Sequence, residues 1–241
     1  MIYIAVRKTL DWTDETSFRA QIPQEVRAGI ELWNKTFRMP YHHYRAELKR
    51  IAQLNLSRIQ GAIVGSPGDV PDGAIAVPVD DDDWFSPDLA KTLENGWDDR
   101  MGCYWPSRFL EVPISFPHRL GLIRKFLFPS TKPRWLCTTN NYAVRYCPET
   151  ADLVRSHIRA SRWFLSHPSD IAKIGTPLSL MNRTLASMTQ LRSEPSRALL
   201  LRKYRRYRKL YAGPAPSDLS WCEPCLDRLR DLHAQPIQAG L

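Results

Sequence analysis

The residues best placed to do chemistry in this chain are four consecutive aspartates, Asp80–Asp83. Adjacent carboxylates repel one another, so such a run needs either a cation or full solvation to compensate its charge. In an extended chain, side chains two apart point to the same side, which would make Asp80 and Asp82 converge, as well as Asp81 and Asp83. Two convergent carboxylates suit Mg²⁺ or Mn²⁺, which keeps its other positions for phosphate and water.

The flanks of the run indicate a site held in place. The apolar segment Ala74–Val79 enters the run directly and is expected to be a buried strand, and Trp84–Phe85 follows it. Ser86 offers an N-cap, and Pro87 suits the first position of a helix that Gly96 would end. An isolated acidic cluster is usually a solvated loop, but a solvated loop needs none of these neighbours. The end of a buried strand is also the usual ligand position in open α/β sheets.

Strand-like and helix-like patterns alternate along the chain. Strands are expected at 1–6, 62–65, 74–79, 109–116 and 134–146. Apolar residues at helical spacing predict helices over 26–37, over 44–54 and after Thr150, and the tail from Pro177 is expected to be helices broken at prolines. Strands interleaved with helices, followed by a helical end, predict a mixed α/β fold with a helical C-terminal extension.

The segment Val79–Pro87 resembles the DxD region of GT-A-fold glycosyltransferases, and its four-aspartate form is similar in particular to a bacterial family of rhamnosyltransferases. Thr138–Arg145 is similar to the asparagine-containing strand that lines the sugar and acceptor site of many GT-A enzymes, and Pro177–Thr184 is a further candidate family element. The resemblance implies a GT-A-like, Rossmann-related mixed sheet flanked by helices over residues 1–190. A basic helical extension over residues 191–241 would pack on or next to it.

The resemblance also implies roles for residues around the motif. Mn²⁺ or Mg²⁺ would be held by Asp80 and Asp82 as the DxD pair, with Asp83 assisting. The nucleotide-sugar donor would be lined by Val6, Arg7, Asp81 and Trp84. Hydroxyls of the sugar or acceptor would be bound by Asn140 and Asn141, since an amide offers both a donor and an acceptor. A turn before a strand is the alternative interpretation of these two asparagines.

A catalytic base is less well defined. An inverting enzyme needs a carboxylate to take the proton of the acceptor hydroxyl, whereas a retaining enzyme need not have one there. The acidic pair that many inverting members carry well downstream of the DxD motif is not evident in this chain. Asp170 and Asp152 lie at comparable distances and are the candidates, although Asp152 would also simply favour the positive start of its helix.

The activity implied is metal-dependent transfer of a sugar from a UDP-, GDP- or dTDP-sugar to a hydroxyl of a glycan or lipid-linked acceptor. One alternative is a basic nucleic-acid-binding protein without catalysis, but no helix-turn-helix, zinc-finger or RNA-recognition signature supports nucleic acid as a partner. Another is an aspartate-based phosphotransfer enzyme. Such enzymes need a small or hydroxyl residue after the motif, where this chain has Trp84.

The chain has 34 basic and 25 acidic residues, a net charge of +9, which favours an anionic partner. The densest basic segment is 202–209, where Tyr204 and Tyr207 would continue an apolar helical stripe from Leu200 to Tyr211. The segment is interpreted in three ways: a packed helix with a solvated basic side, attachment to an anionic inner membrane face, or a nucleic-acid contact.

Five cysteines cannot all pair, and the first residues lack the basic lead of a signal peptide. No apolar stretch approaches the ~20 residues that a membrane helix needs. We therefore expect a cytoplasmic protein with reduced thiols, peripheral at most at the inner membrane face. Cys222 and Cys225 have the spacing of a zinc or redox pair, but a packed helix start explains them as well, and His157 and His167 are further candidate ligands.

Overall fold

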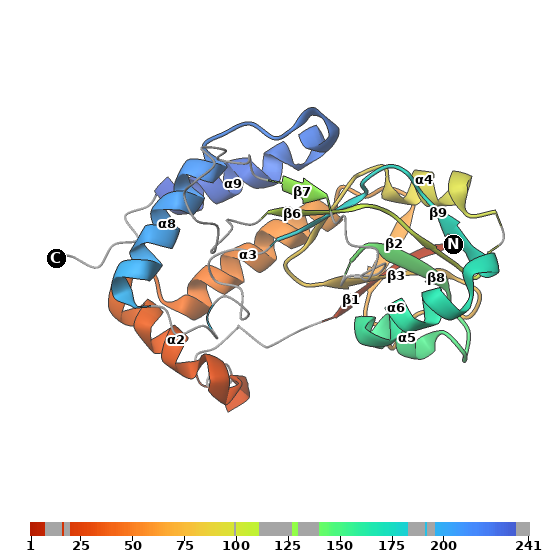
Figure 1. Cartoon of the computed structure of the whole chain (residues 1–241), viewed down its shortest axis with the longest axis horizontal. Coiled ribbons are helices and arrows are strands. Elements are labelled where there is room, and N and C mark those ends of the chain that lie inside the picture. Colours follow the sequence, from red (N-terminus) through yellow and green to blue (C-terminus); the bar gives the residue numbers. More distant parts are fainter. Residues whose placement is uncertain are drawn as a thin grey trace. The chain divides into compact units, whose positions relative to one another are not determined.

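The computed structural model describes residues 1–7, 16, 20–98, 100–110, 127–129, 140–182, 191 and 196–234. These residues form an α/β protein with a six-stranded mixed sheet, mostly parallel, that is flanked by helices, and helices follow at the C-terminal side (Figure 1). The chain divides into two compact units. Unit 1 comprises the described parts of Met1–Thr9, Ala52–Phe109 and Phe128–Met181, and unit 2 those of Leu10–Ile51, Leu110–Leu127 and Asn182–Leu241.

The six-stranded sheet has the order β2-β1-β3-β8-β5-β9. Its strands are β1 (Ile2–Arg7), β2 (Ala62–Gly65), β3 (Ile75–Asp80), β5 (Gly102–Tyr104), β8 (Tyr142–Arg145) and β9 (Ile171–Lys173). β1 runs parallel to β2 and β3, and β5 runs parallel to β9, whereas β8 is antiparallel to both β3 and β5. All strands except β8 therefore end at one edge, the carboxyl edge, where β8 begins.

Both faces of this sheet are covered, which explains why β1 is apolar at successive positions rather than alternating with polar residues. One face packs against α4 (Leu89–Gly96), with core residues Ile2, Ile4, Val77, Val79, Leu89 and Leu93. The other face packs against α5 (Ala151–Arg155) and α6 (His157–Ser166), with Tyr3, Ala5, Ala76, Leu153, Val154 and Phe164 (Figure 1). The short helix η2 (Pro168–Asp170) then leads into β9.

A second, four-stranded sheet has the order β4-β10-β6-β7. It consists of β4 (Trp84–Phe85), β6 (Ser107–Leu110), β7 (Leu127–Pro129) and β10 (Ser179–Met181). The prediction that helices begin at Pro177 was wrong at β10, which pairs antiparallel with β4 and parallel with β6. β6 overlaps the strand expected at 109–116 only at Phe109 and Leu110. Residues 111–116 and 134–139, with Cys137 and Thr138 among them, lie outside the described residues.

Unit 2 is built from helices that are distant in sequence. They are α2 (Gln24–Thr36), the first part of α3 (Tyr41–Leu56), α8 (Arg197–Tyr211), η3 (Ser217–Cys222) and α9 (Glu223–Ala234). Phe37 contacts Tyr204 with ring centroids 5.4 Å apart, and Tyr44 contacts His233 at 5.7 Å. These aromatic contacts join residues before 52 to residues after 182, so the division differs from the expected domains 1–190 and 191–241.

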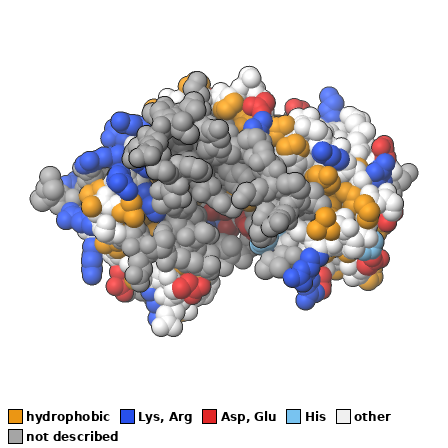
Figure 2. All heavy atoms as spheres, viewed as in Figure 1, with side chains coloured by type: hydrophobic (Ala, Val, Ile, Leu, Met, Phe, Trp, Pro, Cys, Tyr) orange, Lys and Arg blue, Asp and Glu red, His pale blue; other side chains and the backbone are white. Residues whose placement is uncertain are grey.

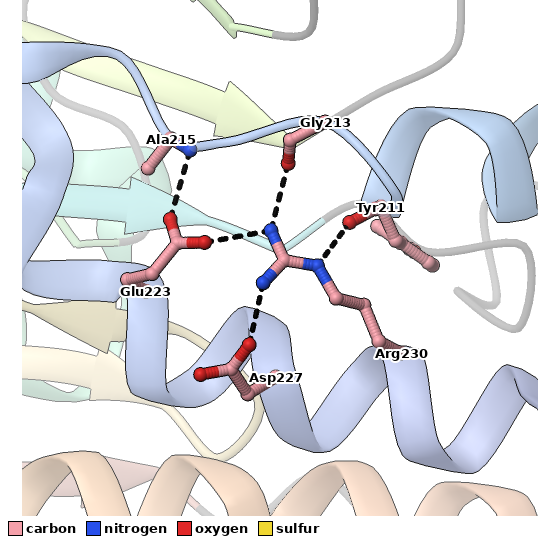
Figure 3. A network of polar contacts seen from close by, with 6 residues as sticks. All are labelled: Tyr211, Gly213, Ala215, Glu223, Asp227 and Arg230. Atoms are coloured by element: carbon pink, nitrogen blue, oxygen red, sulfur yellow. Dashed lines mark hydrogen bonds and ion pairs between the residues drawn. The ribbon is translucent and has the colours of Figure 1, made fainter.

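The connection between α8 and α9 is fixed by one arginine (Figure 3). Arg230 donates hydrogen bonds to the carbonyls of Tyr211 and Gly213 and forms ion pairs with Glu223 and Asp227. The unsatisfied carbonyl groups at the end of α8 are thus partly taken up by a charged donor from α9. No helix among the described residues has the length and apolar composition needed to cross a membrane.

Candidate functional site at the carboxyl edge

Arg7 and Asp80 meet where β1 and β3 end. The parallel register places the two residues opposite each other, and Nη2 of Arg7 lies 3.1 Å from Oδ1 of Asp80. Their side chains are only 11% and 24% exposed. The guanidinium therefore compensates part of the negative charge of the aspartate run in partly desolvated surroundings, where such a pair is stronger than on an open surface. Val6, one residue earlier, packs against the core.

The aspartate run is a turn and not a continuation of the strand. The N–H of Asp83 donates to the carbonyl of Asp80 at 3.2 Å, and Asp81 and Asp82 form the turn between them. The expectation that the run is extended was therefore wrong. Asp81 and Asp83 are buried, at 4% and 2% exposure, whereas Asp80 and Asp82 are half-buried. The half-buried pair is the more accessible to a ligand.

A buried asparagine holds the strand that follows the run. Asn55, in the last turn of α3, donates from Nδ2 to the carbonyl of Phe85 at 2.9 Å and accepts from its N–H at 2.6 Å. The amide thus replaces a strand neighbour for β4. Trp84 is fully buried beside it, so this residue is part of the core and not an open donor-binding wall. The sequence analysis missed Asn55, since an asparagine in a helical stretch offers no signal for a partner 30 residues away.

The two predicted acceptor residues also reach the carboxyl edge. β8 pairs with β3 through Arg145 opposite Ile75 and Val144 opposite Ala76. Continuing this antiparallel register brings Asn140 level with Asp80. Both asparagines are buried, at 0% and 2% exposure, and Nδ2 of Asn141 donates to the carbonyl of Trp105 at 2.9 Å. Asn141 therefore holds the backbone of Trp105.

Trp105 and Ser179 link the asparagines to the aspartate run. The indole N–H of Trp105 donates to Oγ of Ser179 at 2.8 Å, and Oγ of Ser179 lies 3.5 Å from Oδ1 of Asn140. Ser179 in turn pairs with Phe85 across β10 and β4. The sequence analysis did not single out either residue, because Trp105 and Ser179 are 74 positions apart, although Ser179 lies in the candidate family element Pro177–Thr184.

The two candidate bases lie on elements other than those that carry the aspartate run. Asp152 is exposed on α5 and forms an ion pair with Arg159. Asp170 is exposed and directly precedes β9. The first residue of β9 pairs with Gly102 of β5, Gly102 pairs with Val144 of β8, and Val144 pairs with Ala76 of β3. At about 3.3 Å per strand residue, Asp170 lies roughly 15 Å from Asp80 along the strand direction, toward the opposite edge.

His157 is a further titratable group on which the charge of Arg7 acts. It is the first residue of α6, and burial together with the positive charge of Arg7 lowers the pKa of its imidazole. The charge of Arg7 disfavours the protonated form of this ring, as does its burial. His167, at the other end of α6, instead stacks on Trp163 with ring centroids 4.6 Å apart, which accounts for it as a packing residue.

The donor set at the carboxyl edge fits a metal that the substrate helps to hold. No group of three or more His, Cys, Asp or Glu gathers as a metal site among the described residues. Mg²⁺ and Mn²⁺ favour one or two carboxylates completed by phosphate and water, and Asp80 with Asp82 offers this donor set.

The cysteine pair belongs to the core of unit 2. Cys222 and Cys225 are both fully buried, and burial raises the pKa of Cys222 to about 12. A protonated, buried thiol is a poor nucleophile and a poor metal ligand. Leu226, Leu229 and Leu232 are buried on the same side of α9, so the packed helix start accounts for this spacing.

Comparison with known proteins adds no family to this picture. A scan of the chain against protein-family models found no match, and a comparison with curated proteins found no similar sequence. The fold and the site define the class: an α/β protein with a mostly parallel sheet, whose carboxyl edge carries an Arg–Asp pair followed by an acidic turn.

Proposed function

We propose that this protein is a metal-dependent glycosyltransferase of GT-A-like fold that moves a sugar from a nucleotide-diphosphate donor to a hydroxyl acceptor. The observation that supports the proposal most is the position of Asp80, at the carboxyl end of β3 in a mostly parallel sheet, directly before the turn that contains Asp82. Ligands of open α/β sheets bind outside this edge. The mixed sheet with helices on both faces is also compatible with the expected fold.

Within this proposal, Asp80 and Asp82 hold Mn²⁺ or Mg²⁺, because their carboxylates are less buried than those of Asp81 and Asp83. The bound metal would neutralise charge on the diphosphate leaving group. Asp81 and Asp83 add negative potential and fix the turn. Arg7 places a second positive charge beside Asp80, where a guanidinium can bind phosphate oxygens through two parallel hydrogen bonds.

The acceptor side is assigned differently from the sequence expectation. Asn140 and Asn141 shape the edge of the site from within the core, because both are buried and Asn141 holds the backbone of Trp105. No base is assigned to Asp152, which is exposed and paired with Arg159, or to Asp170, which precedes β9 toward the opposite edge of the sheet. His157, near Arg7 and with a lowered pKa, is the described group best suited to accept a proton at this edge.

The test compares Asp82→Asn with Asp72→Asn, an exposed aspartate that precedes the other end of β3. Binding of UDP, GDP and dTDP is measured by calorimetry with and without Mn²⁺. We expect metal-dependent binding of one nucleotide to the native protein and to Asp72→Asn, and loss of that binding in Asp82→Asn. Donor hydrolysis should fall several hundredfold, since such an electrostatic contact is worth about 3–4 kcal/mol in the transition state.

The stability of the Asp82→Asn variant shows whether Asp82 acts in metal binding or in folding. Asp82→Asn relieves repulsion within the run, so its urea unfolding midpoint should equal or exceed that of the native protein. Equal nucleotide binding in Asp82→Asn and native protein, or none in folded native protein with any nucleotide and metal, would rule out the proposed function.

A further inference from the structure

Helix α8 concentrates positive charge on an element whose other side is fixed in the core. It contains seven Lys and Arg residues and no Asp or Glu. Its apolar side packs into unit 2 through Leu200, Tyr204, Tyr207 and Tyr211, none more than 4% exposed. This burial confirms the predicted apolar stripe, so the orientation of the helix about its own axis is set. The remaining face is then presented to the outside.

Five cations occupy that outer face, which we call the basic face: Arg197, Arg202, Arg205, Arg208 and Lys209. None of them forms an ion pair or a hydrogen bond through its side chain with another described residue. Arg230 of α9, by contrast, is held by two carboxylates and two carbonyls (Figure 3). Figure 2 shows Lys and Arg side chains gathered over the part of the molecule where Figure 1 places α8.

The spacing of these cations makes them a charged stripe. Arg202, Arg205 and Arg208 follow one another three residues apart, so they are neighbours on the helix surface, and Lys209 is four residues after Arg205. At 1.5 Å per residue the stripe from Arg197 to Lys209 is roughly 18 Å long. Like charges at this spacing repel each other, and α8 holds no acid to offset the repulsion. An extended anionic partner would offset it.

We propose that the basic face of α8 attaches the protein to the surface of an anionic lipid bilayer. A row of cations on one exposed helix face matches a plane of lipid phosphates, and each such cation adds to the attraction. The tyrosines of α8 are buried, so attachment does not include insertion of aromatic side chains and depends on charge alone. The proposal does not depend on the aspartate site or on the proposed function.

The same features disfavour a nucleic acid as the partner. Single-stranded nucleic acids are bound by exposed aromatic side chains that stack on bases, and here these side chains are buried. Base edges are read by amide and hydroxyl groups as well as arginine, whereas the exposed described positions of α8 hold only Arg, Lys and Ala198.

The test uses two variants with equal change of net charge. One replaces Arg202, Arg205, Arg208 and Lys209 by Gln. The matched control replaces four exposed cations of unit 1 by Gln, namely Lys91, Arg155, Arg162 and Lys173. Flotation with phosphatidylcholine vesicles, with and without phosphatidylglycerol, measures binding of the full chain. We expect binding only to the anionic vesicles, a loss on the order of a thousandfold in the α8 variant, and little change in the control.

Salt and competition complete the test. Binding should be reversed by high salt, because screening shortens the range of these interactions. Absence of binding by the native protein, or an equal loss in both variants, would overturn the proposal. It would also be overturned if duplex DNA or RNA bound more tightly than the vesicles at the same salt and displaced the protein from them.

Discussion

Asn55 and Phe85 form a closed pair of hydrogen bonds, with Nδ2 of Asn55 2.9 Å from the carbonyl of Phe85 and Oδ1 2.6 Å from its N–H. The side chain of Asn55 is fully buried. It therefore satisfies two backbone groups that would otherwise be desolvated without partners. Since Phe85 follows the aspartate run by two residues, the pair also fixes where that run leaves the sheet.

Replacing Asn55 by Ala should destabilise the fold strongly. Each buried backbone group left without a partner costs about 1–3 kcal/mol, so the loss of both hydrogen bonds should lower the free energy of unfolding by about 2–5 kcal/mol. Urea denaturation followed by circular dichroism measures this change. Asn95→Ala, at an exposed position of α4, is the matched control and should stay within about 0.5 kcal/mol of the native protein. Equal midpoints for both variants would contradict the structural role of Asn55.

The hydrogen bond between Trp105 and Ser179 can be isolated by a double-mutant cycle. Trp105→Phe and Ser179→Ala each remove it, so their effects should be non-additive by about 1 kcal/mol. Trp97→Phe is the control for ring size, since Trp97 is also buried but its indole N–H has no hydrogen-bond partner among the described residues. We expect Trp105→Phe to cost more than Trp97→Phe in urea unfolding. Strict additivity of the Trp105 and Ser179 effects would show that the bond contributes no stability.

His233 predicts how stability depends on pH. Burial, and secondly the positive charge of Arg208, lowers the pKa of His233 from 6.5 to about 4. Nε2 of its ring and the hydroxyl oxygen of Tyr44 share a hydrogen bond of 2.7 Å. Between these two pKa values the unfolded chain binds the proton and the folded protein does not. Stability from this group is therefore complete above pH 6.5 and is lost as the pH falls toward 4, by about 3 kcal/mol in total.

The free energy of unfolding is measured between pH 7.5 and pH 4 for the native protein and for His233→Gln, and the two pH profiles are compared. This pH range spans the two pKa values of His233, about 4 and 6.5. Glutamine keeps a hydrogen-bonding group toward Tyr44 but does not titrate, so its profile should be flatter over this range. His43→Gln, at an exposed position, should leave the native pH dependence unchanged. Tyr204 and Tyr211 also face the ring, but burial raises the pKa of each hydroxyl, so they do not titrate in this range.

Long apolar runs made much of unit 1 predictable. The first strand and the strand that ends at Asp80 are continuous apolar segments, as expected for strands covered on both faces. Strands β5, β9 and β10 have only three residues each, which is too short for periodicity to separate a strand from a loop. Their positions follow from pairing with distant segments, and pairing cannot be inferred from local pattern.

The candidate site was predictable where its chemistry is local and not where it depends on tertiary contact. Adjacent aspartates after an apolar strand are visible in the sequence, as is the arginine that ends the first strand. The hydrogen bonds from Asn55 to Phe85 and from Trp105 to Ser179 span 30 and 74 positions, and nothing at either end marks the partner. The contact of Phe37 with Tyr204 joins the described part of residues 10–51 to the C-terminal helices. No local pattern in the sequence indicates this contact.

Single substitutions of three aspartates test which of them the proposed activity requires. Asp80→Asn should lower metal-dependent donor hydrolysis several hundredfold, because it removes a charge from the edge where the diphosphate would bind. Asp152→Asn should leave hydrolysis unchanged, since this carboxylate is exposed and its ion pair with Arg159 is worth about 0–1 kcal/mol at most. Asp170→Asn should also leave it unchanged, as Asp170 lies toward the opposite edge of the sheet.

Nucleotide release from the donor, measured with saturating Mn²⁺, provides the comparison for all three variants, and urea midpoints show whether each is folded. His157→Gln is added because the positive charge of Arg7 acts on His157, and we expect it to slow transfer to an acceptor more than it weakens nucleotide binding. A folded Asp170→Asn or Asp152→Asn that binds nucleotide normally but no longer turns over would reverse this assignment. In that case the carboxylate must reach the reacting hydroxyl.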